Sequence, residues 1–508
     1  MSRSYLEKIL RARVYDVARE TPLDFASRLS ARLGTPIWLK REDMQSVFSF
    51  KLRGAYNKIY NLPEKKKRQG VIAASAGNHA QGVALAGKRL GVPALIVMPT
   101  TTPPIKVQTV RNLGAKIILH GDSYDDAYEH ARTLVKEKGL TFVHPFDDPD
   151  VIAGQGTVAT EVLRQHEEPI EAVFIPVGGG GLIAGMAAYI KRVRPEIKII
   201  GVEPEDTPTL HHALQAGRRV SLKQIGLFAD GVAVRQIGKE TFKLARDLVD
   251  EVVLVTTDEI CAAIKDIYDD TRSVAEPAGA LGIAGIKKYL QKKKNRNKPG
   301  SLISVLSGAN INFDRLRHVS ERAELGEQRE ALFAVEIPER PGSFLSFCRL
   351  LGKRNVTEFN YRYFDDKRAH VFCGIELSDG SEERDNIIER LQGRGFGVTD
   401  LTDNETAKLH IRYMVGGHAP QVKNERLYRF VFPERPGALL DFLSGLTRGW
   451  NISLFHYRNH GAAYGRVLVG VQLNKAEAGE FRDYLRELGY RYHEETGNPA
   501  YQLFAGAG

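Results

Sequence analysis

Lys51 is the residue whose type and position best suit covalent chemistry. It follows Ser49 and Phe50 and opens a stretch, residues 52–59, in which apolar residues recur at helical spacing. A lysine at the start of a buried helix meets the positive end of the helix dipole and an apolar surrounding, and both disfavour its ammonium form. The neutral amine forms Schiff bases with aldehydes and acts as a base. Alone, the pattern also describes an ordinary surface cation, so its meaning depends on the residues that accompany it.

A run of four glycines and a leucine, Gly178-Gly179-Gly180-Gly181-Leu182, is the second element. It follows an apolar strand that ends at Val177 and opens a helix. Glycines let the backbone approach an anion closely, and consecutive N–H groups at a helix start point at it. The run therefore favours a phosphate-binding turn, whereas a tight turn without a ligand is the alternative. No Lys-Ser or Lys-Thr follows it, so it is not a nucleotide P-loop.

The same run supports a rival hypothesis. It contains Gly179-x-Gly181-x-x-Ala184, and Glu203 ends the next apolar strand. This is the pattern of a dinucleotide-binding turn, which would make the protein an oxidoreductase. That hypothesis leaves Lys51 without a role.

Two further loops carry polar residues between a strand and the element after it. The loop Ser75-Ala76-Gly77-Asn78-His79 offers helix-terminal amides for a carboxylate and the Asn78 amide for a phenolic oxygen. Simple helix capping by Ser75 or Asn78 explains the loop equally well. Ser307 opens the loop Ser307-Gly308-Ala309-Asn310, where its hydroxyl can meet a ring nitrogen, although a strand-ending turn is the plainer alternative. Glu276-Pro277-Ala278-Gly279-Ala280 adds a possible further wall.

The elements that must position these loops alternate from about residue 36 to 320. Short apolar runs rich in Val and Ile, such as 71–74, 93–98 and 172–177, are each followed by a helical stretch. Strands that are apolar on both faces and joined by helices predict an α/β fold with a parallel sheet covered on both sides. Ligands of such sheets bind at the carboxyl ends of the strands, where these loops lie.

After about residue 330 the sequence contains a repeat. Residues 333–337, a Pro-Glu-Arg-Pro-Gly turn and 359–362 resemble residues 428–432, a second Pro-Glu-Arg-Pro-Gly turn and 455–458. Each copy predicts strand, helix, two strands, helix and strand, which is a βαββαβ module. The tail is therefore two copies of one small α+β domain.

Composition places few other constraints. The 508 residues carry a net charge of +10, but the excess lies in short surface runs, which argues against nucleic-acid binding. The three cysteines are not spaced as metal ligands or disulfide partners, so a reducing compartment and no metal are expected. The N-terminus has no apolar signal stretch and no run approaches the about 20 residues of a membrane span. The sequence predicts a cytoplasmic enzyme that does not bind membranes.

These motifs, in this order, resemble fold-type II pyridoxal-phosphate enzymes (tryptophan synthase β-like). Over nearly the whole chain the sequence is similar to the biosynthetic threonine deaminases, also called threonine ammonia-lyases or threonine dehydratases. The similarity includes residues 21–23, 144–147 and 154–157, and the junction 320–330 that is typical of this family. It implies a catalytic domain, 1–320, with a small subdomain at about 45–150, a linker, 321–330, and ACT-like regulatory domains at 331–402 and 426–497.

The resemblance also implies roles for the site residues. Lys51, beside Phe50, would form the Schiff base with pyridoxal 5'-phosphate and act as the base. Asn78 would meet the cofactor's phenolic oxygen, the glycine run with Leu182 its phosphate, and Ser307 its ring nitrogen. The substrate would bind at the loop made by Ser75, Ala76, Gly77 and His79.

The family's activity is the deamination of L-threonine to 2-oxobutanoate and ammonia, the first committed step of isoleucine biosynthesis. L-Serine would be a second substrate, and a serine/threonine dehydratase of broader range is the alternative within the family. Isoleucine would inhibit and valine activate through the tail, with Tyr361 and Tyr457 as candidate effector residues; the alternative is that both tyrosines are core residues. The family implies a homotetramer. A non-catalytic amino-acid sensor is a third hypothesis, against which the intact Lys51 argues.

Overall fold

The computed structural model describes every residue except 1, 293–299, 314, 339, 341, 353, 363–367, 410, 415, 417–418, 420–421, 434–437, 446–449, 459–463, 475, 499–500 and 502–508. The chain folds as two compact units, residues 1–326 and 327–508. Within the described ranges, no helix is long and apolar enough to cross a lipid bilayer.

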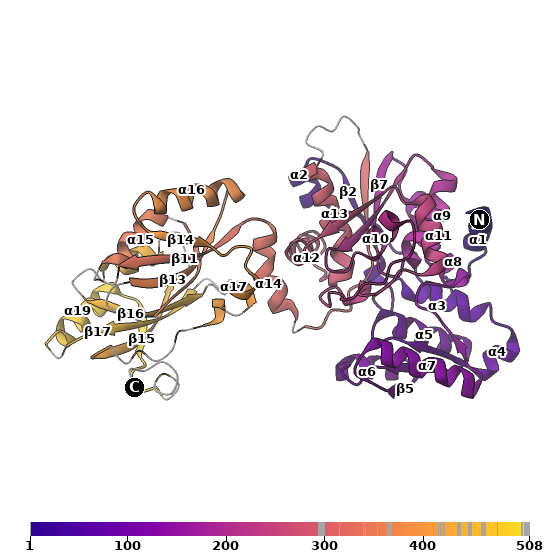
Figure 1. Cartoon of the computed structure of the whole chain (residues 1–508), viewed down its shortest axis with the longest axis horizontal. Coiled ribbons are helices and arrows are strands. Elements are labelled where there is room, and N and C mark those ends of the chain that lie inside the picture. Colours follow the sequence, from indigo (N-terminus) through magenta and orange to yellow (C-terminus); the bar gives the residue numbers. More distant parts are fainter. Residues whose placement is uncertain are drawn as a thin grey trace. The chain divides into compact units, whose positions relative to one another are not determined.

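The N-terminal unit is built on two sheets, which are drawn from indigo to pink in Figure 1. The larger sheet has the order β1-β2-β10-β7-β8-β9, and β1 is its antiparallel edge strand. The strands are β1 (Leu23–Phe25), β2 (Ile37–Arg41), β7 (Ile170–Pro176), β8 (Lys198–Pro204), β9 (Glu251–Val255) and β10 (Ser301–Leu306). The smaller sheet is wholly parallel, in the order β5-β4-β3-β6. Its strands are β3 (Val71–Ala74), β4 (Ala94–Met98), β5 (Lys116–Leu119) and β6 (Thr141–Phe142).

Helices cover both faces of the larger sheet (Figure 1). One apolar core lies between the sheet and α2 (Ser27–Leu33), α12 (Thr257–Thr271), α13 (Pro277–Lys292) and α14 (Arg315–Gly326). The opposite core involves α8 (Pro149–Gln165), α9 (Gly181–Val193), α10 (Thr209–Ala216) and α11 (Lys239–Leu248), and α1 (Ser2–Leu10) packs against α8 and α9. The smaller sheet packs with α3 (Lys51–Tyr60), α5 (Asn78–Leu90), α6 (Pro104–Asn112) and α7 (Tyr124–Lys138), and α4 (Glu64–Gln69) follows α3.

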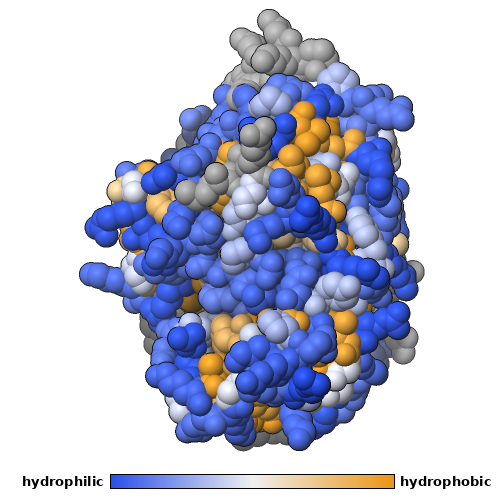
Figure 2. All heavy atoms as spheres, turned by 90° about the vertical axis from the view of Figure 1, so that its right-hand side faces the viewer, coloured by the Kyte–Doolittle hydropathy of each residue, from blue (hydrophilic) through white to orange (hydrophobic). Residues whose placement is uncertain are grey.

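Local sequence explains why these elements form. Every residue of β3 and of β10 is buried, as expected for central strands covered on both faces. Ser123 and Thr256 begin α7 and α12 with capping boxes, in which the cap side chain and an acidic residue three positions on satisfy each other's backbone N–H. Viewed from the side of α1, the surface is mostly hydrophilic, with apolar residues gathered in separate patches (Figure 2).

The C-terminal unit consists of two βαββαβ modules, as the repeat predicts. The first contains β11 (Glu330–Pro338), α15 (Ser343–Leu351), β12 (Val356–Arg362), β13 (Arg368–Glu376), α16 (Gly380–Gln392) and β14 (Gly397–Asp400). The second contains β15 (Glu425–Pro433), α18 (Ala438–Gly445), β16 (Asn451–Arg458), β17 (Tyr464–Gln472), α19 (Ala478–Leu488) and β18 (Arg491–Glu494). Strands β12 and β16 pair antiparallel, so the modules share one eight-stranded sheet and one apolar core. Between the modules lie α17 (Glu405–Leu409) and the short helix η3 (Ile411–Tyr413).

The predicted fold class is confirmed in both units. The parallel sheets with helices on both faces and the duplicated α+β module are all present. Residues 321–330, predicted as a linker, contain the last two turns of α14 and the first residue of β11.

Candidate active site

Lys51 is the first residue of α3, as the sequence predicts. Its Nζ donates to the carbonyl oxygen of Pro145 at 3.2 Å and lies 5.2 Å from the centre of the Phe50 ring. Burial lowers the pKa of the Lys51 amine to about 8, although the negative charge of the Glu276 carboxylate acts to raise it. A substantial fraction of this amine is therefore neutral near physiological pH, as a Schiff-base lysine requires.

A cluster of fully buried charges anchors α3. The Arg53 guanidinium donates to both carboxylate oxygens of Glu42, each at 2.8 Å, and to those of Glu161 at 2.6 and 3.0 Å. Lys40 adds an ion pair of 2.6 Å to Glu161, so two cations face two carboxylates with none of the four side chains exposed. Because Glu161 lies in α8 and Lys40 in β2, the cluster fixes the helix that begins at Lys51 against both.

The loop from Ser75 to Gly77 lies between β3 and α5, and Asn78 begins that helix. Helix α5 approaches Lys51 closely because Gly82 has no side chain: a Cβ at 82 would lie 3.1 Å from the Lys51 carbonyl carbon and oxygen. The amide of Gly77 donates to Ser75 Oγ at 3.2 Å, and no side chain caps the helix. The structure thus brings this loop to Lys51 and keeps the first turn of α5 open to an anion.

His79 is buried in the first turn of α5 and is neutral. Burial, with the nearby Lys51 charge, lowers the pKa of its imidazole to about 3. A neutral ring whose Nε2 lies 2.8 Å from the Val143 carbonyl oxygen donates to it. His79 therefore ties α5 to the segment 143–147 and supplies no cationic partner for a carboxylate.

Segment 143–147 connects the parts of the site. Pro145 accepts the Lys51 hydrogen bond, and the Phe146 ring packs on the glycine run. The Asp147 carboxylate accepts from the backbone N–H groups of residues 239, 240 and 241 and so caps α11. His144 Nδ1 accepts from the N–H groups of residues 146 and 147, which fixes the turn.

The glycine run forms a tightly enclosed cradle at the start of α9. A Cβ at Gly179 would overlap the Phe146 ring, and one at Gly178 would lie 2.9 Å from the Val232 Cα. Gly180 has a φ of +88°, which favours glycine. Thr241 Oγ1 donates to the Gly179 carbonyl oxygen at 2.7 Å, so the carbonyl is turned away from the N–H groups that an anion needs. Leu182, the next residue, is buried in α9.

Ser307 follows β10 and lies beside the start of α3. Its carbonyl oxygen accepts from the Phe50 N–H at 3.3 Å, and Ser49 forms an isolated bridge with Gly308. Its buried hydroxyl is 3.4 Å from the Ala278 carbonyl oxygen. The structure therefore brings together Lys51, Phe50, the Asn78 loop and Ser307 through a chain of contacts between distant segments.

Glu203 has a structural role that the rival hypothesis does not accommodate. Its Oε1 accepts from Thr209 Oγ1 at 2.9 Å and from the Leu210 N–H at 2.8 Å, and its Oε2 accepts from the His211 N–H at 2.9 Å. The carboxylate thus caps α10, and because Glu203 is fully buried it is not exposed to a ribose. The dinucleotide-binding hypothesis is not supported.

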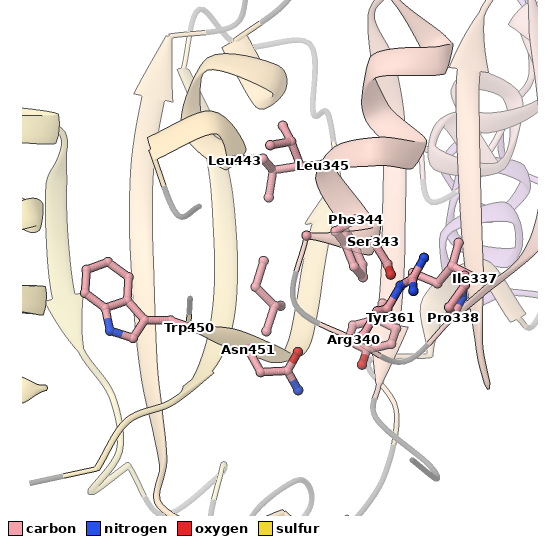
Figure 3. A pocket seen from close by; sticks show the side chains of 12 residues that line it. Ile337, Pro338, Arg340, Ser343, Phe344, Leu345, Tyr361, Leu443, Trp450 and Asn451 are labelled. Atoms are coloured by element: carbon pink, nitrogen blue, oxygen red, sulfur yellow. The ribbon is translucent and has the colours of Figure 1, made fainter. Parts of the chain in front are cut away.

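The two candidate effector tyrosines lie in different surroundings. Both are buried on the helix-covered face of the shared sheet, where Tyr361 pairs with Phe455 and Tyr457 with Phe359. Tyr361 also lines a pocket between the modules, shown in Figure 3. Tyr457 does not line this pocket, and residues 434–437, part of the second Pro-Glu-Arg-Pro-Gly sequence, lie outside the described residues.

For several residues that shape the site the sequence predicted no specific contact, and Glu276 and Asn310 were predicted only as members of the segments 276–280 and 307–310. Phe146, Val232 and Thr241 enclose the glycine run, and Glu276 and Asn310 contact Asn78. The resemblance marked segment 144–147 without a function, and nothing in the sequence indicated Val232 or Thr241, which come from distant segments.

The arrangement fits pyridoxal phosphate. The N–H groups of the glycine cradle suit a phosphate, the buried amine of Lys51 suits an aldehyde, and the Asn78 and Ser307 side chains can hydrogen-bond a pyridine ring. The Ser49 hydroxyl and the His79 Nδ1, both near Lys51 in the sequence or in space, are buried without a protein partner, as expected near a polar ligand site.

Comparison with known proteins gives consistent matches. Residues 14–308 match the family model "pyridoxal-phosphate dependent enzyme". Residues 321–411 and 416–505 each match "C-terminal regulatory domain of threonine dehydratase".

Individual relatives match over nearly the full length. The chain is 58% identical to L-threonine dehydratase biosynthetic IlvA of Burkholderia multivorans, covering 99% of each protein. It is 56% identical to the Escherichia coli protein of that name, covering 98% of this chain and 96% of the relative. The processed form of threonine deaminase isoform 2 from Solanum lycopersicum matches with a TM-score of 0.62 and 52% identity, covering 63% of this chain and 93% of that one.

Proposed function

The chain belongs to the pyridoxal-phosphate-dependent enzymes and, within them, to the biosynthetic threonine dehydratases, and we propose that it deaminates L-threonine to 2-oxobutanoate and ammonia. The observation that carries the proposal is a buried lysine of lowered pKa at the start of α3, joined through Pro145 and Phe146 to a glycine cradle. The reaction is the first committed step of isoleucine biosynthesis. L-Serine, one methyl group smaller, is the proposed second substrate.

The proposal also assigns the residues that would hold the cofactor. The N–H groups of Gly178 to Leu182 would bind the phosphate, and the Asn78 amide would donate to the phenolic oxygen. The Ser307 hydroxyl would meet the ring nitrogen, and Phe50 lies beside the Lys51 amine. When bound, the cofactor supplies a conjugated ring that stabilises negative charge at the substrate Cα.

The protein's own groups then act on the substrate. The loop Ser75 to Gly77, with the uncapped N–H groups at the start of α5, binds the carboxylate and so orients the Cα–H bond. The Lys51 amine, whose neutral form burial favours, takes the α-proton. A neutral serine, Ser307, would not keep the ring nitrogen of a bound cofactor protonated as a carboxylate would, and this would favour departure of the β-hydroxyl over return of the proton to Cα.

The chemistry is tested by assay and by labelling. Purified protein with pyridoxal phosphate should release 2-oxobutanoate from threonine, and Lys51→Ala should abolish this release while the circular-dichroism spectrum stays unchanged. Borohydride reduction followed by mass spectrometry should place the cofactor on Lys51. Threonine-dependent ammonia release by the variant, or a label on another residue, would contradict the assignment.

Regulation by isoleucine as inhibitor and valine as activator is the second part of the proposal. The pocket between the modules combines apolar Ile337, Phe344 and Ile452 with the polar side chains of Arg340 and Tyr361. Arg340 and Tyr361 lie on one side of it, beside the start of α15, with Asn451 across from them (Figure 3). A guanidinium beside a helix start suits a carboxylate, and the apolar wall suits a branched side chain.

The cavity is narrow, with a volume of about 30 Å³, so we expect the lining side chains to move when an amino acid binds. Such a movement gives effectors a means to favour one state of the unit over another, which allosteric control requires. Tyr457 is proposed to contact an effector in the second module as Tyr361 does in the first. The variants Tyr361→Phe and Tyr457→Phe test these two assignments, and each is expected to weaken inhibition by isoleucine.

The decisive regulatory experiment separates the pocket from the rest of the unit. Arg340→Ala should weaken isoleucine inhibition about tenfold or more, because a charged hydrogen bond contributes roughly 1.5–3 kcal/mol. Arg354→Ala, which removes an arginine paired with Glu383 instead, should leave inhibition unchanged. If Arg340→Ala and Arg354→Ala weakened isoleucine inhibition equally, the effector site would have to lie outside this pocket. Removing residues after about 325 should abolish inhibition.

The remaining assignments are also proposals. We place the enzyme in the cytoplasm as a homotetramer, with a catalytic domain at 1–320, a linker at 321–330 and regulatory domains at 331–402 and 426–497.

A further inference from the structure

The amide of Asn78 is held from two sides by residues of distant segments. Asn310 Nδ2 donates to Asn78 Oδ1 at 2.7 Å, and Asn78 Nδ2 donates to Glu276 Oε1 at 2.7 Å. Asn310 Nδ2 also donates to the Val47 carbonyl oxygen at 2.9 Å, and the Asn310 backbone N–H donates to Glu276 Oε2 at 3.0 Å. The four residues form one continuous hydrogen-bonded chain.

The direction of this chain is set at Val47, whose carbonyl oxygen can only accept. The Asn310 amide must therefore turn its N–H groups to Val47 and to the Asn78 oxygen, which leaves the Asn78 N–H groups facing Glu276. Turning the Asn310 amide over would place its oxygen against the Val47 oxygen. Turning the Asn78 amide over would place its oxygen against Glu276 and its N–H groups against those of Asn310.

The surrounding glycines leave little room for another arrangement. A Cβ at Gly308 would lie 2.5 Å from Glu276 Oε1 and 3.2 Å from Asn78 Nδ2. A Cβ at Gly231 would lie 3.3 Å from Glu276 Oε1. The backbone at Gly308 therefore packs directly against the hydrogen bond between Asn78 and Glu276.

The Glu276 carboxyl group is 3% exposed, and its charge is finely balanced. Burial, with a smaller contribution from the Asp230 carboxylate, raises its pKa to about 7, while the two N–H donors and Lys106 oppose the rise. Glu276 also raises the pKa of Lys51 by its charge, so a variant at 276 can act on the site by two routes.

We propose that Glu276 and Asn310 are positioning residues that hold the Asn78 amide with one N–H directed at the phenolic oxygen of the cofactor. The inference rests on the proposed cofactor site. One N–H of Asn78 is engaged by Glu276, and the fixed orientation leaves the second for the ligand. Without the carboxylate, Asn310 holds the amide from one side alone, so the second N–H of Asn78 is less firmly directed at the phenolic oxygen.

The test is a double-mutant cycle on the full-length enzyme, with the variants Glu276→Gln, Asn78→Ala and both together. Two quantities are measured: the dissociation constant of pyridoxal phosphate from the apoenzyme, and the pH midpoint of the visible absorbance of the holoenzyme. Glutamine accepts only one of the two N–H donors that meet residue 276. Glu276→Gln should therefore weaken binding about three- to tenfold, as expected for one hydrogen bond. It should also shift the midpoint in the same direction as Asn78→Ala.

The decisive result is the double variant. If Glu276 acts through Asn78, Glu276→Gln should change either quantity less than about twofold when alanine already occupies position 78. An undiminished shift in that background would show that Glu276 acts directly, for example on Lys51, and would overturn the inference. So would a Glu276→Gln enzyme with both quantities at their wild-type values.

Two control variants distinguish a failure of the inference from general destabilisation and from a failure of the proposed cofactor site. Asp266→Asn removes a different buried carboxylate, paired with Arg32 and Lys287, and should lower the unfolding temperature without moving the midpoint. If the absorbance midpoint of Asp266→Asn also shifts, the shift in Glu276→Gln reflects general destabilisation, and the inference is overturned. Wild-type binding and absorbance in Asn78→Ala would instead refute the cofactor contact itself, on which the inference depends.

Discussion

Gly179 is the position at which one added methyl group should most disturb the phosphate cradle. A Cβ at this position would overlap three ring carbons of Phe146, and one at Gly181 would lie 3.1 Å from the Phe146 Cα. Carbon atoms normally pack at about 3.5–4.0 Å, so in Gly179→Ala the ring or the turn must move. The ring cannot move without disturbing its edge contact with His144, and Pro145 next to it receives the Lys51 hydrogen bond.

The size of the effect follows from the cost of overpacking. Inserting a methyl group into a filled site costs about 1–3 kcal/mol. If that strain is relieved when the cradle opens, it weakens cofactor binding by about 5- to 150-fold, since each 1.4 kcal/mol is about a factor of ten. Titration of the apoenzyme with pyridoxal phosphate, followed by absorbance, measures the dissociation constant directly.

Two matched variants show whether the reasoning is right. Phe146→Ala in the Gly179→Ala background removes the overlapping ring and should restore part of the lost affinity. Gly285→Ala places its methyl group against Val202 in the core between α13 and the sheet, so it should lower the unfolding temperature but leave cofactor affinity within about twofold. Wild-type affinity in Gly179→Ala, or no recovery when the ring is removed, would refute the assignment of the cradle.

Three further predictions concern charged groups. Because the pKa of Lys51 is about 8, the rate of covalent cofactor uptake should rise about fivefold from pH 7 to pH 8 and level off above about pH 9; a continued tenfold rise per pH unit to pH 10 would show an unshifted amine. Arg53→Met should destabilise the N-terminal unit by about 3–5 kcal/mol in urea unfolding, because it leaves Glu42 and Glu161 with only one buried cation; a loss below about 1 kcal/mol would contradict this. Glu203→Ala should cost about 1–2 kcal/mol by removing the cap of α10, and saturable NAD binding by the wild-type protein, lost in this variant, would revive the rival hypothesis.

The strands and helices around the site and the position of Lys51 at a helix start were predictable because they depend on short-range patterns. Apolar runs predict buried strands, helical spacing after Lys51 predicts the start of α3, and the repeated Pro-Glu-Arg-Pro-Gly turn predicts two equal modules. The structure places each of these elements within a few residues of its predicted position.

Contacts between distant segments were not predictable in this way. Phe146 packs on the glycine run, and Glu276 and Asn310 contact Asn78 from 198 and 232 positions away. Glu203 contacts Thr209 only 6 positions on, but its role as a helix cap was not predicted either. The spacing of Glu203 after the glycines even indicated the wrong partner, because a carboxylate at a strand end can bind a ribose or cap the next helix. Only the tertiary structure decides whether the carboxylate faces a ligand or the next helix.

The sequence by itself determined which elements form and which loops stand at the carboxyl ends of strands, because both follow from local periodicity and turn chemistry. Tertiary structure alone decided how Lys51 is desolvated, which way the Asn78 amide points and which tyrosine faces the pocket between the modules. Those properties depend on burial and on partners far away in the chain, and they exist only once the segments are packed together.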